Sequence, residues 1–242
     1  MFDHVAIRAS DRAASERFYD LVLGAIGIER THSGELGPEW DDFALAQADG
    51  ENPPTRRLHI GFVARSRELV DAFWRAGTEA GYEDDGEPGF RPQYSDDYYG
   101  AFLLDPDGNS AEAVHHGSLR EGGSVDHLWI RVSDLGASTS FYELVGPAAG
   151  FRVGGEHADR TRFACVSGSF SVVRGDEPTE HVHLAFSASD NETVDRFHRD
   201  TTAAGYRDNG RPGERTVYHA GYYAAFVLDP DGNNIEVVNH NR

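Results

Sequence analysis

The residues with the clearest chemical potential are histidines and glutamates that recur in both halves of this 242-residue chain. Two imidazoles and one carboxylate can hold Fe²⁺, Mn²⁺, Zn²⁺, Ni²⁺ or Co²⁺ and leave positions open for water and substrate. Each half of the sequence contains such a set. The six candidate metal ligands are His4, His59, Glu112, His127, His183 and Glu236.

An internal repeat organises these residues along the chain. DHVAIRASD (3–11) returns as DHLWIRVSD (126–134), and YYGAFLLDPDGNSAEAV (98–114) returns as YYAAFVLDPDGNNIEVV (222–238). FYDLV and LHIGF also have counterparts, at the same offset of 123 or 124 residues. A repeat of this length indicates a duplicated domain. We expect domains at 1–118 and 124–242, joined by the linker SLREGGS (118–124).

Each domain divides again into two similar modules. In the first domain we expect a strand at 4–8, a helix at 11–24 and strands near 27–32 and 39–47. The order restarts with a strand at 58–64, a helix at 66–80 that Ser66 caps and Gly81 ends, and strands within 82–114. The prediction is an α+β fold with four βαβββ modules. Its helices cover one sheet face, and the other face curves around a cleft.

Alternation along the expected strands sorts the side chains by face. Val5 and Ile7 suit the helix-covered core, which directs His4 to the cleft. The same alternation applies to the other five candidate ligands. We therefore expect each domain to place its own two histidines and one glutamate on the concave side.

The acidic segment before each glutamate has a different explanation. Asp105–Asn109 and its copy Asp229–Asn233 have the Pro and Gly placement of a tight turn between antiparallel strands. Their spacing and ligand number do not match a calcium loop. We interpret these acids as turn-forming residues.

Composition excludes several classes of partner and chemistry. The net charge of −19 disfavours nucleic acid and anionic membranes, and no stretch is long and apolar enough to span a bilayer. The chain has no lysine, so Schiff-base chemistry is excluded. The first residues lack the pattern of a secretory signal, and the single cysteine, Cys165, indicates a reducing cytoplasm.

The paired βαβββ layout, the strand-opening histidine and the ending AFxLDPDGNxxE resemble the vicinal-oxygen-chelate superfamily. This superfamily includes glyoxalase I, bleomycin-resistance proteins, fosfomycin-resistance enzymes and extradiol dioxygenases. The resemblance covers nearly the whole chain. It implies a metal that binds neighbouring oxygens of a small-molecule substrate. It also implies two ligand sets: His4, His59 and Glu112, then His127, His183 and Glu236.

The resemblance does not select one reaction. Glyoxalase I sites usually have a fourth protein ligand, which would fall near 43–49 or 163–174, where Gln47 is only a weak candidate. Extradiol dioxygenases use three ligands, but the tyrosine expected before their DPxG turn is Phe102 here and Phe226 in the second copy. Both a dioxygenase and a lyase or isomerase therefore stay open.

Other residues are candidates for roles at the site. Tyr98, Tyr222 and His219 are the candidate catalytic residues, since they lie near the positions that activate substrate and oxygen in extradiol enzymes. The candidate substrate-binding residues are Arg8, Arg131, Trp129, Tyr94 and Tyr218.

Two functions of different classes follow. The first is a cytoplasmic metal-dependent enzyme with two sites that acts on a small oxygen-chelating molecule. The alternative is a metal-free protein that sequesters a drug or metabolite, as bleomycin-resistance proteins do, and the acidic charge suits a cationic ligand. A monomer and a homodimer are equally compatible with four modules.

Overall fold

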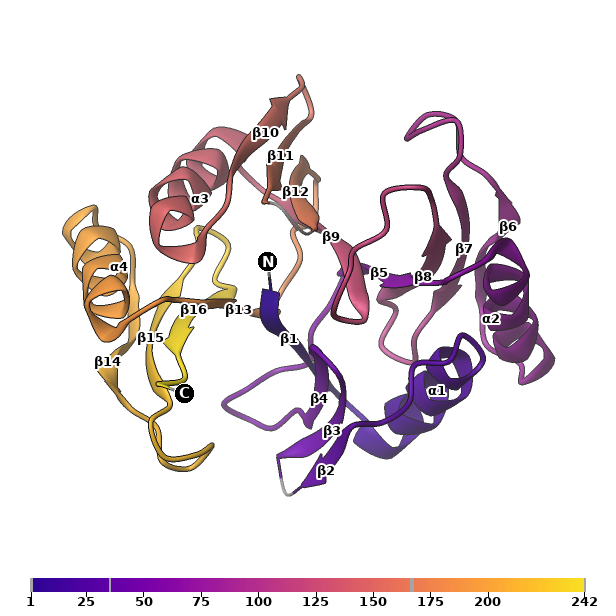
Figure 1. The fold of residues 1–242 in the computed structure, drawn as a ribbon, viewed down its shortest axis with the longest axis horizontal. Coiled ribbons are helices and arrows are strands. Elements are labelled where there is room, and N and C mark those ends of the chain that lie inside the picture. The colour runs from indigo at the N-terminus through magenta and orange to yellow at the C-terminus, as the bar shows by residue number, and fades with distance from the viewer. Residues whose placement is uncertain (1, 35, 166–167, 242) are drawn as a thin grey trace. The chain divides into compact units, whose positions relative to one another are not determined.

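The computed structural model describes residues 2–34, 36–165 and 168–241, and it confirms the α+β fold with four modules (Figure 1). The first two modules comprise β1 (Phe2–Ala9), α1 (Arg12–Gly24), β2 (His32–Gly34), β3 (Gly37–Trp40) and β4 (Phe43–Gln47), then β5 (His59–Val63), α2 (Arg67–Glu79), β6 (Asp84–Phe90), β7 (Tyr99–Leu104) and β8 (Ser110–His115). The last two comprise β9 (Val125–Val132), α3 (Leu135–Ala149), β10 (Arg152–Glu156), β11 (Arg160–Ala164) and β12 (Ser169–Arg174), then β13 (His183–Ser187), α4 (Asn191–Ala203), β14 (Asp208–Glu214), β15 (Tyr223–Leu228) and β16 (Asn234–Asn239).

The strands form two eight-stranded sheets that combine modules in an unexpected way. One sheet has the order β14-β15-β16-β13-β1-β4-β3-β2, and the other has the order β10-β11-β12-β9-β5-β8-β7-β6. The first module therefore shares a sheet with the fourth, and the second with the third. The sequence repeat by itself does not indicate this combination of modules. Alternation within a strand reports its faces, whereas its neighbours depend on long-range pairing.

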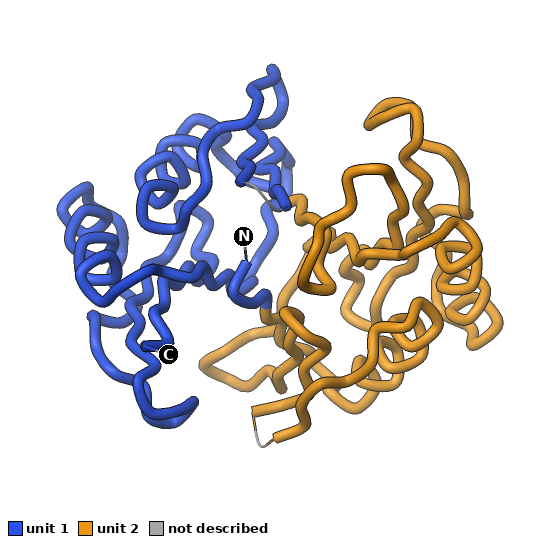
Figure 2. Tube along the Cα trace, in the orientation of Figure 1, with its two compact units in different colours: residues 1–5, 130–242 blue, residues 6–129 orange. Residues whose placement is uncertain are grey.

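The chain also divides into two compact units, here called unit 1 and unit 2. Unit 1 contains residues 1–5 and 130–242, and unit 2 contains residues 6–129 (Figure 2). Their limits fall inside β1 and β9, the first strand of each sequence repeat. Compared with the limits expected from the repeat, residues 1–5 group with the second half and residues 124–129 with the first.

Local signals explain where the helices begin and end. The Ser66 side chain caps α2 by accepting a hydrogen bond from the Leu69 amide, as predicted, and Asp11 caps α1 through the Ala14 amide. Gly81 follows α2 with φ of +88°, a conformation that favours glycine. The strand expected near 27–32 is found only as β2, which begins at His32, because the chain is still turning at Gly27, where φ is +81°.

The predicted face alternation is confirmed by burial. Val5, Ile7, Ile60 and Phe62 are each 1% exposed or less, and their strand neighbours such as His4 are only half-buried. The other residues expected in the core are also buried: Ala111, Ala113, Leu128, Ile130, Leu184, Phe186, Ile235 and Val237. In β8 and β16, however, the intervening Glu112 and Glu236 are buried as well, so burial by itself does not separate the two faces of these strands.

The DPDGN segments are turns, as predicted. The Asp105 carboxylate accepts hydrogen bonds from the amides of Asp107 and Asn109 and from the Tyr19 hydroxyl, at 2.8–2.9 Å. Asp229 makes the equivalent contacts, including one from Tyr142 at 3.1 Å. Each turn thus fixes the start of a glutamate-bearing strand against a helix of the neighbouring module.

The segment that leads into β9 is anchored by a buried acid. Asp42 accepts hydrogen bonds from the Ser124 and Val125 amides, at 2.8 and 3.0 Å, and forms an ion pair with Arg120. Asp42 and Arg120 are only 6% and 7% exposed. None of the helices among the described residues combines the length and the hydrophobicity of a membrane-spanning helix.

Candidate metal centres

The six candidate ligands gather into two groups, one in each unit. His59, Glu112 and His127 form the unit 2 centre, and His4, His183 and Glu236 form the unit 1 centre, with ligand atoms within 4.8 Å of one another in each. The grouping predicted from the sequence repeat is wrong, because His4 and His127 are exchanged. Both are carried by strands, β1 and β9, that lie beside the opposite repeat's strands β13 and β5.

In the unit 2 centre one carboxylate oxygen faces two imidazoles. Oε2 of Glu112 lies 3.0 Å from Nε2 of His59 and 3.3 Å from Nε2 of His127, and the two Nε2 atoms are 3.4 Å apart. Glu112 is 1% exposed. The three donor atoms converge on one point from β5, β8 and β9.

The unit 1 centre repeats this arrangement. Nε2 of His183 lies 2.9 Å from Oε2 of Glu236 and 3.1 Å from Nε2 of His4, and the third edge, His4 to Glu236, is 3.7 Å. Bonds of about 2.1 Å at right angles place neighbouring ligand atoms about 3 Å apart. Both donor sets therefore fit three adjacent positions around one divalent ion.

Outer hydrogen bonds orient the histidines of the unit 2 centre. Nδ1 of His127 donates to Oδ2 of Asp126 at 2.9 Å. Nδ1 of His59 lies 3.2 Å from the Ser110 hydroxyl, which donates its own hydrogen to Asp85 at 2.6 Å and so accepts from the ring. Both rings thereby keep the Nδ1 proton, so that loss of any proton from Nε2 would leave the Nε2 lone pair directed at a bound metal, as in metal-binding histidines.

The charges of the unit 2 centre are strongly coupled. Burial by itself raises the pKa of Glu112, but hydrogen bonds from His127 and His59 lower it to about 2. Burial lowers the pKa of His127, yet the Asp126 and Glu112 carboxylates raise it to about 10. Without a metal, His127 is therefore an imidazolium held between two carboxylates.

Asp126 contacts a second histidine outside the centre. His116 Nε2 lies 3.2 Å from Oδ2 of Asp126, and its ring stacks on Tyr98 at 5.5 Å. Although burial raises the pKa of Asp126, its hydrogen bonds with His116 and His127 hold that pKa below its usual range.

The unit 1 centre has a longer chain of outer contacts. Asp3 accepts from Nδ1 of His4 at 3.0 Å and from Nε2 of His240 at 2.8 Å, and His240 Nδ1 lies 2.9 Å from Nε2 of His219. On the other side, the Asn234 amide lies 2.6 Å from Nδ1 of His183. The predicted catalytic residue His219 thus joins this centre through His240 and Asp3.

The predicted tyrosines stand directly beside the glutamates. The Tyr98 hydroxyl donates to Oε1 of Glu112 at 2.8 Å, and the Tyr222 hydroxyl donates to Oε1 of Glu236 at 2.7 Å. Burial and the neighbouring carboxylate raise the pKa of both tyrosines well above 10. Both hydroxyls therefore stay protonated at neutral pH.

Two predicted substrate-binding aromatics lie next to the unit 2 centre. The centroid of the Trp129 ring lies 6.1 Å from the ring centroid of His59 and 5.5 Å from that of Tyr94. Phe102, at the position of the dioxygenase tyrosine, lies 5.8 Å from His59. In unit 1, the ring centroids of Tyr218 and Tyr222 lie 4.7 Å apart.

The structure does not place Arg8, Arg131 or Gln47 at a metal centre. The substrate-binding role expected of the two arginines stays a prediction. Nη1 of Arg8 donates to the Gln47 carbonyl at 3.3 Å, and Arg131 is exposed. Gln47 is the last residue of β4, and its side-chain amide donates to the carbonyls of Ala9 and Ser10 at 3.2 Å, at the end of β1. Residues 166 and 167, within the segment 163–174 where a fourth ligand would fall, lie outside the described residues.

Sequence reasoning missed the residues that orient the ligands. Asp3 and Asp126, as well as His240 and His116, occupy equivalent positions of the repeat. Their presence in both copies was the available signal. Gly61 was also missed: a Cβ there would overlap the His127 ring, so this strand position leaves room for the ligand.

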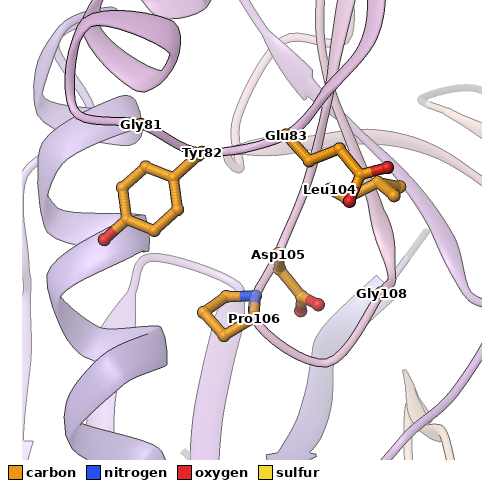
Figure 3. A pocket seen from close by; sticks show the side chains of 7 residues that line it. All are labelled: Gly81, Tyr82, Glu83, Leu104, Asp105, Pro106 and Gly108. Atoms are coloured by element: carbon orange, nitrogen blue, oxygen red, sulfur yellow. The ribbon is translucent and has the colours of Figure 1, made fainter.

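A cavity of about 340 Å³ lies elsewhere in unit 2, beside the first DPDGN turn (Figure 3). It is lined by Gly81, Tyr82, Glu83, Leu104, Asp105, Pro106 and Gly108, and includes no candidate ligand. The Asp105 carboxylate already accepts the hydrogen bonds of the turn. We therefore assign this pocket to the turn and not to a metal centre.

The chain belongs to the glyoxalase/bleomycin resistance protein/dioxygenase superfamily, whose family model matches residues 1–113 and 124–237. This result confirms the resemblance inferred from the motifs. No curated protein sequence matches the chain.

Solved structures show the same fold at low identity. Glyoxalase I from Zea mays has a TM-score of 0.68 and 17% identity, over 99% of this chain and 92% of that chain. A "putative dioxygenase" from Bacillus subtilis has a TM-score of 0.66 and 12% identity, over 100% of this chain and 85% of that chain. These similarities support the four-module fold and select no reaction.

Proposed function

We propose that each centre binds one divalent transition metal and that the protein is an enzyme acting on a small molecule with two neighbouring oxygens. The observation that carries this proposal is the convergence of two Nε2 atoms and one carboxylate oxygen in each unit, at 2.9–3.7 Å. Nδ1 of His4, His59 and His127 lies against an acceptor oxygen in each case, which supports a ligand role for the Nε2 atoms of these three residues.

The donor set defines the metals to test. Two imidazoles and one carboxylate suit Fe²⁺, Mn²⁺, Zn²⁺, Ni²⁺ or Co²⁺ and leave positions open for two substrate oxygens. A bound metal of this kind acts as a Lewis acid that polarises the oxygens of its ligand. Three protein ligands, with no fourth identified among the residues that the structure describes, are compatible with a dioxygenase and with a lyase or isomerase.

The chain's own residues would then hold the substrate and its protons. Tyr98 and Tyr222 are the proposed catalytic residues, because their protonated hydroxyls lie beside the ligand carboxylates. A substrate oxygen that competes for such a hydroxyl would receive a hydrogen bond as its negative charge grows. His219, Arg8 and Arg131 remain proposed participants.

Metal content tests the proposal directly. After reconstitution with Zn²⁺, we expect two equivalents in the wild type and one in each of the variants Glu112→Gln and Glu236→Gln. The control Glu79→Gln changes an exposed glutamate of α2 and should retain two. A wild-type protein that holds no stoichiometric metal would contradict the proposal and favour the metal-free sequestering protein.

Oxygen use separates the reactions. A dioxygenase consumes oxygen when the Fe²⁺-loaded protein is given a catechol or similar diol, whereas a lyase or isomerase turns over without oxygen and with redox-inert metals.

The wider setting is also part of the proposal. The substrate would be a small molecule. Because the three candidate ligands of each centre lie within one unit, both a monomer and a homodimer are compatible with two centres. The single cysteine, Cys165, favours the cytoplasm.

A further inference from the structure

The surroundings of the two centres differ more than their ligands do. In unit 2, five rings form a closed circuit around Glu112: His59, Trp129, Tyr94, Tyr98, His127 and back to His59, with successive centroids 5.0–6.4 Å apart. Two members of this circuit are ligands, and the other three form an aromatic wall. The Phe102 ring also lies near His59, with ring centroids 5.8 Å apart.

Part of this aromatic wall is exposed to solvent. Tyr94 is 43% exposed, and Trp129 is partly exposed, whereas Glu112 is buried. Trp129 meets both His59 and Tyr94 edge to face, with interplanar angles of 64° and 80°. A ligand bound at the donor atoms would therefore have the Trp129 ring, whose centroid lies 6.1 Å from that of His59, as an aromatic neighbour.

The sequence repeat replaces the central member of this wall in the other copy. The position equivalent to Trp129 is Ala6, which has no ring. Unit 1 retains Tyr218, Tyr222 and Phe226 near its centre, as the pairs Tyr218–Tyr222 and His183–Phe226 show. The circuit of unit 2 therefore cannot form in the same way around Glu236.

We propose that the unit 2 centre selects flat aromatic ligands with two neighbouring oxygens, with Trp129 and Tyr94 as the specificity-determining residues, and that the unit 1 centre lacks this selection. The inference rests on the proposed metal-binding function. Aromatic rings attract one another beyond the area they bury, in offset-stacked and edge-to-face arrangements, and so discriminate a ring from an aliphatic group on the same chelating head.

A pair of hydroxamates isolates the effect of the ring. Benzohydroxamate and acetohydroxamate chelate through the same two oxygens and differ in the phenyl group. Their affinities are measured by calorimetry on Zn²⁺-loaded Glu236→Gln, which keeps the unit 2 centre, and on Zn²⁺-loaded Glu112→Gln, which keeps the unit 1 centre. We expect the benzohydroxamate preference to be roughly 3- to 10-fold larger at the unit 2 centre.

Variants of the wall identify the residues responsible. In the Glu236→Gln background, Trp129→Ala should remove most of that extra preference and leave acetohydroxamate affinity unchanged, while Trp129→Phe should restore most of it. Benzohydroxamate should also quench tryptophan fluorescence, and this quenching should disappear in Trp129→Ala. The control Trp74→Phe changes a tryptophan that donates to Asp84 and should keep both effects.

The outcomes separate the two proposals. If acetohydroxamate binds both centres but the preference for the phenyl group is equal and insensitive to Trp129→Ala, aromatic selection by unit 2 is overturned while metal binding stands. If neither centre takes up Zn²⁺, the proposed function fails, and the selection fails with it.

Discussion

His127 is both a buried, positively charged imidazole and a candidate metal ligand. It is 9% exposed and lies between the carboxylates of Asp126 and Glu112, at 2.9 and 3.3 Å. Two carboxylates offset the burial of one imidazolium. A metal ion at Nε2 would replace the proton in this role, because metal ligands must be deprotonated.

In the metal-free protein, the stability that His127 contributes should therefore fall as pH rises above 6.5. Since the pKa of His127 is raised from 6.5 to about 10, its contribution is fully present below pH 6.5 and is lost toward pH 10. Since the pKa of Glu112 is lowered from 4.5 to about 2, its contribution is present above pH 4.5 and is lost toward pH 2. The pair contributes most between pH 4.5 and 6.5.

Urea unfolding with a chelator present measures this effect. The difference in unfolding free energy between wild type and His127→Gln should be largest near pH 5.5 and shrink steadily at pH 7, 8.5 and 9.5. His32→Gln, an exposed histidine, should show little difference at any pH. A His127→Gln difference that does not change with pH would contradict the coupled charges.

At the level of secondary structure, β9 is the element whose placement matters most to unit 2. Its start is held by Asp42, which binds the Ser124 and Val125 amides and pairs with Arg120. Two residues later the strand carries His127. The segment expected to be a linker is therefore an anchored part of the site's framework.

Replacing Asp42 with Ala should destabilise unit 2 strongly. Removing the carboxylate takes away the ion-pair partner of buried Arg120 and the acceptor of two amides, which costs roughly 3–5 kcal/mol. Urea unfolding measures the loss, and Asp42→Asn, which keeps an acceptor oxygen but no charge, should lose less. Asp96→Ala, at an exposed site, should change stability by under about 0.5 kcal/mol. Equal stability of Asp42→Ala and wild type would rule out this anchoring role.

Across the whole molecule, each centre is built from both sequence repeats. β1 of the first repeat supplies His4 to ligands of the second, and β9 of the second supplies His127 to ligands of the first. Both centres therefore depend on a strand of one repeat, β1 or β9, lying beside a strand of the other repeat, β13 or β5.

Pairs of substitutions test this arrangement. Because His4 and Glu236 belong to one centre, His4→Gln combined with Glu236→Gln should retain one Zn²⁺ per chain. His4→Gln combined with Glu112→Gln should retain none, because each change disables a different centre. Elemental analysis after dialysis gives the count, and circular dichroism verifies folding. The reverse result would assign His4 to Glu112, as the order of the sequence suggests.

The sequence by itself determined the four modules, the face of each strand and the six candidate ligands, because strand alternation and helix capping are local properties. His4 beside buried Val5, and Glu112 between buried Ala111 and Ala113, are readable from their neighbours alone. The repeat also contained Asp3 and His240, whose contact spans 237 positions and could not be inferred from spacing. Only the tertiary structure decided which histidine joins which glutamate and placed Trp129 against His59. Both depend on which strands pair across the chain, and a strand's own sequence does not name its partner.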